Sequence, residues 1–241
     1  MSIVEYQHIF SNHLLKQFHA APEVKNSHEL IWPSVFLIFC LCLLALVKGR
    51  ALPRLIRIVQ STFSNQILQQ LEREELNSLK FYATALNTFF VLNLSFLIYK
   101  VNSIYHIVLV DFTSFVQFCF FLFAVVLLLS FKRVVNIVLA AFTDSRRLIS
   151  DYTTNSTLVN QTFGLFLFPW IILLEFTTFN PLLFISGGVI ILSGAVLLKW
   201  YRGIIMGLLV ERIGILQIFS YFCGLEILPL FVMVKYIIVT F

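Results

Sequence analysis

Long apolar runs, separated by short polar or charged segments, constrain this chain more than any other feature of its sequence. Each run is long enough to cross the hydrocarbon core of a bilayer as a helix of about 20 residues. Within a bilayer every backbone amide and carbonyl needs an internal partner, which a helix supplies. The pattern therefore predicts an all-α polytopic membrane helix bundle with about six transmembrane helices plus amphipathic interfacial helices. The spans are expected at about residues 31–47, 81–99, 113–131, 159–176, 181–198 and 214–234.

The composition leaves little room for a separate globular domain. Of the 241 residues, 59% are hydrophobic and 12% are charged, against about 25% charged in a typical soluble domain. We expect a polar N-terminal segment at 1–30 and a single transmembrane domain at 31–241. The first segment lacks the order of a cleaved signal, a basic stretch followed by an apolar one, so we expect the first span to be retained.

Basic residues are distributed unevenly between the two sides of such a bundle. With six spans, 13 of the 17 Lys and Arg residues fall in alternate connectors on one side and 4 on the other. The basic side is expected to be cytoplasmic, which places both termini outside. The positive net charge then reflects anchoring at a lipid bilayer, and we expect no nucleic-acid partner.

The connector at 49–80 has the pattern of an amphipathic helix. It would lie along the membrane surface or cap the bundle, either as an ordinary connector or as a lipid or partner site. Its charged and polar candidate residues are Arg73, Glu74, Glu75 and Asn77. Its expected apolar face comprises Leu52, Leu55, Ile56, Val59, Phe63, Ile67 and Leu71.

Two further patterns concern helix packing. In the second span, Thr84, Thr88 and Ser95, with Asn87 beside them, form a weakly polar stripe that is expected to hydrogen-bond to neighbouring helices. In the fifth span, the small residues at 186–188 recur seven residues later at 193–195. This strip of small side chains predicts close helix approach.

One carboxylate lies deep within an apolar run. Glu226 precedes Pro229 by three residues and Lys235 by nine, so it should lie about 13 Å below the interface at 1.5 Å per residue. A charge at that depth is costly, so the group should face the interior, pair or be protonated. Two interpretations remain open: a hydrogen-bonded lock at a proline kink, or a proton- or ion-coupling group in a transporter. Glu175 is the comparable ionisable residue on another span.

We find no sequence motif for catalysis, a metal or a cofactor. The four cysteines lie in apolar stretches, where a thiol behaves as a small hydrophobe. Asn155-Ser156-Thr157 fits the glycosylation pattern, but the predicted topology places it on the cytoplasmic side. A non-enzymatic protein without a bound cofactor is therefore expected.

Three segments together resemble a known family. They are FSNQILQQLEREELNSLKF leading into LNLSFLIY, then NQTFGLFLFPW, and finally YFCGLEILPLFVMVKY, within roughly residues 50 to 240. In this order they resemble small multi-pass inner-membrane proteins of the Bacteroidota that are catalogued as a domain of unknown function. The resemblance implies a bacterial inner (cytoplasmic) membrane and about six helices. It also suggests an association with envelope machinery such as type IX secretion or gliding.

The packing patterns and the charged connector together favour an accessory or scaffold subunit of a cell-envelope complex. Its expected partners are other membrane proteins or further copies of the chain. The alternative hypothesis is a small transporter or channel that uses Glu226.

Overall fold

The structure is a computed structural model that describes residues 27–61, 80–105, 107, 112–142, 146–177 and 181–210. Over these residues the predicted all-α membrane bundle is confirmed. The described chain forms five helices, each long and apolar enough to cross a membrane: α1 (Ser27–Ser61), α3 (Lys80–Tyr105), α4 (Ser114–Phe142), α5 (Arg146–Phe176) and α6 (Pro181–Val210). The sixth expected span, 214–234, lies outside the described residues, and it stays a prediction, as does the division at residue 30.

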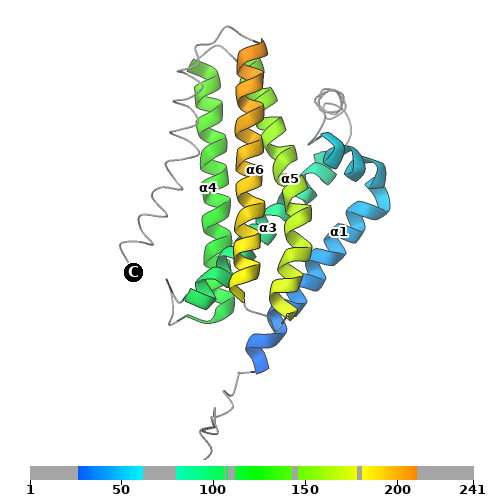
Figure 1. Ribbon diagram of the computed structural model, residues 1–241, viewed down its shortest axis with the longest axis vertical. Helices are drawn as coiled ribbons and strands as arrows, with labels where there is room; N and C mark the ends of the chain where they lie inside the picture. The colour runs from blue at the N-terminus through cyan, green and yellow to red at the C-terminus, as the bar shows by residue number, and fades with distance from the viewer. Residues whose placement is uncertain are drawn as a thin grey trace, which may run out of the picture.

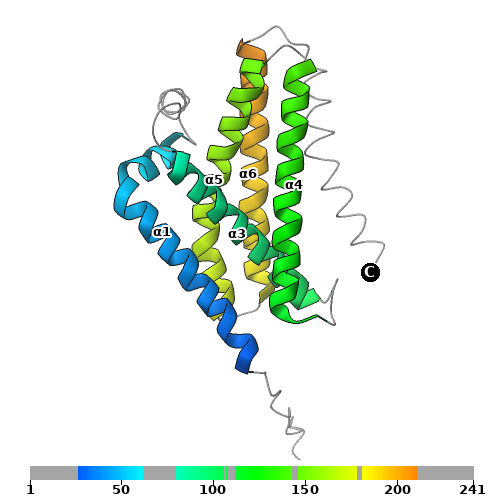
Figure 2. The ribbon, with the colours of Figure 1, turned by 180° about the vertical axis from the view of Figure 1, so that it is seen from behind.

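Three helices stand side by side, and the other two cross them at an angle. Helices α4, α6 and α5 run nearly upright in Figure 1, and Figure 2 shows α3 crossing them obliquely, with α1 on its outer side. Helices α3 and α5 are the central elements, because each packs against all four of the other described helices. Of the apolar span of α5, 56% is buried, against 17% for the span of α4.

The helices are longer than the apolar runs that predict them. Helix α3 continues beyond the expected end of its span and reaches Tyr105, while α4 begins only at Ser114. The residues at 104 and 105 therefore belong to α3, beyond the expected span at 81–99.

Helix α1 extends into the expected connector and turns back toward the bundle near its C-terminal end (Figures 1 and 2). Pro53 lies in this part of the helix, and an internal proline removes a backbone hydrogen bond and bends a helix. In this last part Ile58 and Ser61 are buried, whereas Ile56 is exposed. Ile58, which is not among the residues of the expected apolar face, packs against Leu86 and Leu158.

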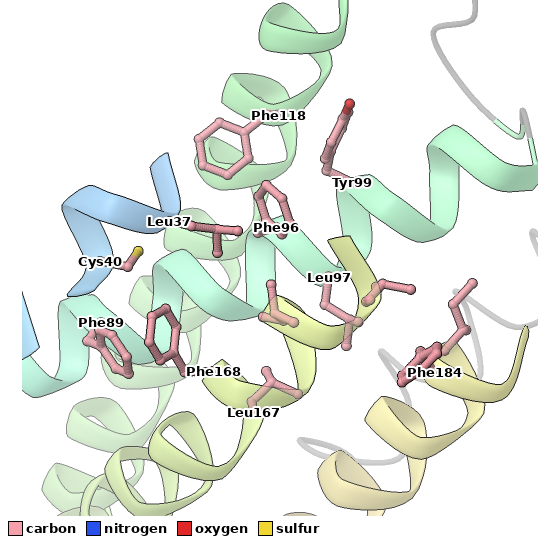
Figure 3. Close-up of a cluster of buried hydrophobic side chains, with 13 residues drawn as sticks. Leu37, Cys40, Phe89, Phe96, Leu97, Tyr99, Phe118, Leu167, Phe168 and Phe184 are labelled. Carbon is pink, nitrogen blue, oxygen red and sulfur yellow. The ribbon is translucent and has the colours of Figure 1, made fainter. Parts of the chain in front are cut away.

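The core is a cluster of aromatic and aliphatic side chains contributed by all five helices (Figure 3). Phe96 of α3 stacks on Phe36 of α1 at 4.9 Å between ring centroids, and Phe118 of α4 contacts both rings edge-on. Phe89 of α3 lies 5.2 Å from Phe168 of α5. Such interlocked rings fix the angles at which α1, α3, α4 and α5 cross.

Candidate functional site

A buried arginine on α6 joins three helices near one end of the bundle. The guanidinium of Arg202 donates a hydrogen bond to Asn155 Oδ1 on α5 at 2.7 Å, and another to the backbone carbonyl of Ser61 on α1 at 2.5 Å. Arg202 is 5% exposed, while Asn155 and Ser61 are 0% exposed. We name these three residues the Arg202 cluster.

The end of α1 explains why an arginine is useful there. The last carbonyls of a helix have no partner within it and need donors from elsewhere. The Ser61 hydroxyl donates to the carbonyl of Ile58 at 2.7 Å, and the Thr162 hydroxyl lies 3.4 Å from the same oxygen. Arg202 serves the carbonyl of Ser61 itself, and its positive charge complements the negative end of the helix dipole.

More buried polar side chains lie further along α5 and on α6. Gln161 donates from Nε2 to the backbone carbonyl of Ala83 on α3 at 3.0 Å, so it ties α5 to α3. Lys199 lies one turn before Arg202 on α6 and is also buried. In this part of α5, three buried side-chain atoms have no hydrogen-bond partner among the described residues: Asn155 Nδ2, Asn160 Oδ1 and Gln161 Oε1.

The positive charge of Arg202 determines which kind of group the cluster can bind. Among the described residues, no carboxylate forms an ion pair with Arg202. Guanidinium groups only donate hydrogen bonds, so the cluster favours acceptors and anions and repels cations. In the described helices no three His, Cys, Asp or Glu side chains come close enough together to hold a metal ion.

The opposite end of the bundle carries an ion pair. Lys100 Nζ on α3 lies 2.5 Å from Glu175 Oε2 on α5, with both side chains mostly buried. The same ammonium group is 5.8 Å from the ring centres of Phe96 and Tyr99. This ion pair crosses the interface between α3 and α5 and so links the two helices.

Most of the residues singled out from the sequence lie outside the described residues. These are Glu226, Pro229, Arg73, Glu74, Glu75 and Asn77. Asn87 is described and is half-buried on α3.

The predicted polar stripe of the second span does not form one buried face. Thr84 and Thr88 are exposed, whereas Ser95 is buried. The Ser95 hydroxyl donates to the carbonyl of Val91 in its own helix at 2.8 Å. For Ser95 the expected bond to a neighbouring helix was wrong, because a serine within a helix reaches the carbonyl four residues back.

The small-residue strip of α6 does allow close packing, as predicted. A Cβ atom placed on Gly187 would lie 2.1 Å from the Trp170 ring of α5, and one on Gly188 would lie 3.2 Å from Leu97 of α3. The Trp170 indole donates to the carbonyl of Phe184 at 2.6 Å. The small-residue strip therefore packs against Trp170 of the same chain.

The Arg202 cluster itself was missed by the sequence analysis. Arg202 lies beyond the expected span at 181–198, and Asn155 belongs to the glycosylation pattern at 155–157. One sequence signal points to the cluster: Asn155 and Thr162 are seven residues apart, on one helix face. In the structure, both are buried and face the end of α1.

Comparison with known proteins gives one finding. No curated protein and no solved structure matches the chain. A family model with the description "Domain of unknown function (DUF4271)" matches residues 34–237, which includes all the described helices apart from the start of α1. Within the matched region the described helices form an apolar bundle, in which the buried Arg202 bonds to two other helices. By this match the chain belongs to the DUF4271 family.

Proposed function

We propose that this protein is a non-enzymatic accessory or scaffold subunit of a cell-envelope complex in a bacterial inner membrane. The observation that carries the proposal is that polar and ionic side chains of the interior fasten helices to one another. Arg202 links α6 to α1 and α5, Gln161 links α5 to α3, and the Lys100–Glu175 pair links α3 to α5 at the other end.

These hydrogen bonds and this ion pair between helices suit a scaffold subunit. Each lies at an interface between helices, so it opposes the sliding and rocking of helices on which alternating-access transport depends. The outward faces, in contrast, are apolar and suit contact with lipid or with other membrane helices. Envelope machinery of the Bacteroidota, such as type IX secretion or gliding, is the complex that the family resemblance suggests.

Charge placement supports the orientation included in this proposal. Lys48, Arg57, Lys132, Lys199 and Arg202 lie toward the end of the bundle where α1, α4 and α6 finish, whereas Lys100 lies toward the other end. The basic end is the cytoplasmic one under the positive-inside rule. With the sixth expected span at 214–234, both termini are then periplasmic.

Native extraction tests the subunit hypothesis. The tagged protein is extracted gently from its own membranes, and co-purifying proteins are quantified by mass spectrometry. The control is a tagged, unrelated multi-pass protein from the same membranes. We expect a partner that is reproducible, near-stoichiometric and missing from the control; recovery of the chain alone or only as a homo-oligomer contradicts the proposal.

A transporter is the second candidate, and the burial of Arg202 with no carboxylate beside it among the described residues favours it. An ionisable residue within a span is a functional candidate by default, and the sequence offers Glu226 as a second one. If the chain is a transporter, Glu226→Gln abolishes flux in proteoliposomes at unchanged abundance. Lower abundance without a flux phenotype assigns Glu226 to packing and contradicts this second function.

A further inference from the structure

The Arg202 cluster has more hydrogen-bond donors than acceptors. A guanidinium has five N–H groups, and the structure gives Arg202 two bonds, to Asn155 Oδ1 and to the Ser61 carbonyl. Because the guanidinium only donates, the oxygen of the Asn155 amide must face it, which fixes the amide nitrogen as the group without a partner. Asn155 is completely buried, so this unpaired nitrogen lies beside a buried positive charge.

Such an arrangement is unfavourable unless an acceptor is supplied. A buried charge that lacks a counter-charge carries a large desolvation penalty, and an unpaired buried donor adds to it. In the described part of the chain no carboxylate neutralises Arg202. A single oxyanion beside the guanidinium and the Asn155 amide would satisfy both groups, and charge-assisted bonds of this kind are the strongest available.

The depth of the cluster indicates where that oxyanion comes from. Arg202 lies three residues inside the end of the α6 span Pro181–Ile205, and Asn155 lies three residues inside the start of the α5 span Tyr152–Phe176. At 1.5 Å per residue this is about 4.5 Å from the edge of the apolar region. Trp200 and Tyr201 adjoin Arg202 in the sequence, and aromatic residues of this kind mark the headgroup level.

We propose that the Arg202 cluster binds a phosphoryl oxyanion at the junction of α1, α5 and α6, as carried by an acidic phospholipid headgroup or by free phosphate. The guanidinium and the Asn155 amide nitrogen donate to the phosphoryl oxygens, while Ser61 and Asn155 Oδ1 hold the guanidinium in place. Basic sites between transmembrane helices on the cytoplasmic side are known to suit acidic headgroups. The site goes beyond the subunit function, since it requires no protein partner.

The test compares lipid environments for the full chain. The wild-type protein is reconstituted in nanodiscs of phosphatidylcholine alone, and in nanodiscs that also contain phosphatidylglycerol. Thermal unfolding and native mass spectrometry of retained lipid are the readouts. We expect a higher Tm with phosphatidylglycerol, and about tenfold preferential retention of it, equivalent to about 1.4 kcal/mol.

Two variants separate the oxyanion site from general electrostatics. Asn155→Asp is nearly isosteric and places a carboxylate on the guanidinium, so it should fold and lose both the Tm increase and the lipid preference. Arg133→Gln removes one positive charge from an exposed position on α4 and should keep both. Arg202→Lys, which retains the charge and loses the planar fork, should weaken the preference.

The outcomes are distinguishable. A wild-type Tm and lipid retention that do not respond to phosphatidylglycerol or to inorganic phosphate overturn the proposal, and so does a full preference in Asn155→Asp. If inorganic phosphate in phosphatidylcholine nanodiscs raises the Tm of the wild type and leaves that of Asn155→Asp unchanged, the site is confirmed with free phosphate as its ligand. A response to phosphatidylglycerol alone assigns the lipid headgroup.

Discussion

At the scale of single residues, Gly187 and Arg202 hold α6 against its neighbours in two different ways, the first by close packing and the second by hydrogen bonds. Gly187 belonged to a strip expected to pack closely, and it does, against Trp170. The role of Arg202 could not be predicted in this way, because its partners are 47 and 141 positions away in the chain. A small-residue repeat is local, so it can be read from the sequence; a hydrogen bond between distant helices depends on the assembled bundle.

Replacing Arg202 by methionine should destabilise the protein. The substitution leaves the Ser61 carbonyl and Asn155 Oδ1 without their donor, and each buried orphan costs about 1–3 kcal/mol. Thermal unfolding in detergent measures the effect, with the exposed Arg133→Met as control. Equal melting temperatures for the two variants would show that the cluster contributes nothing to stability.

Two glycine-to-alanine substitutions form a second matched test. At Gly187 the new methyl group would lie 2.1 Å from the Trp170 ring, whereas at Gly49 nothing lies within 4 Å. Gly187→Ala should destabilise by about 1–3 kcal/mol through overpacking. Gly49→Ala should be neutral or should stabilise by up to about 1 kcal/mol, because alanine is the better helix former. Similar losses in both variants would contradict the close approach of α6 to α5.

At the scale of helices, hydropathy located the described spans but not the ends of the helices. An apolar run ends where lipid contact ends, while backbone hydrogen bonding continues through polar residues. Helix α5 illustrates this, because it begins at Arg146, well before the expected span at 159–176. The thirteen residues before the expected span contain Asn155, so this partner of Arg202 lies in the part of the helix that precedes the expected span.

The ion pair between α3 and α5 should contribute measurably to their packing. Lys100 and Glu175 are 2.5 Å apart and mostly buried, so removing either partner leaves a charge in an apolar setting. A double-mutant cycle of Lys100→Met and Glu175→Gln should give a coupling energy of about 0.5–3 kcal/mol. The exchange Lys100→Glu with Glu175→Lys should recover part of the stability that the single reversals lose. Additive effects in the cycle would mean that the pair is energetically silent.

At the scale of the whole molecule, the bundle is arranged with its least apolar spans inside. The spans of α3 and α5 are the least apolar of the five described and also the most buried, while the most apolar, on α4, is the least buried. Lipid cannot satisfy polar side chains, so helices that carry Asn, Gln and Thr turn them toward other helices. Relative hydropathy alone could therefore have predicted which of the described helices lie inside the bundle. Their contacts and crossing angles depend on side-chain packing, which hydropathy does not describe.

The orientation in the membrane can be tested with single cysteines in a background lacking the four native ones. Arg57 and Tyr105 are exposed residues toward opposite ends of the bundle. With the basic end cytoplasmic, a membrane-impermeant maleimide applied from the periplasmic side should label Tyr105→Cys and leave Arg57→Cys unlabelled until the membrane is opened. The reverse pattern would invert the proposed topology.

The pairing of α5 with α6 has a consequence for biogenesis. Only four residues, 177–180, separate the two helices, and none of them is charged. The helices pack on each other through Trp170 and Gly187, so together they form an antiparallel hairpin with a neutral tip. Such a hairpin can enter the bilayer from the translocon as one unit, with Glu175 as the one ionisable residue near its tip that must cross the hydrocarbon core. It carries Asn155 and Arg202 into the membrane already facing each other.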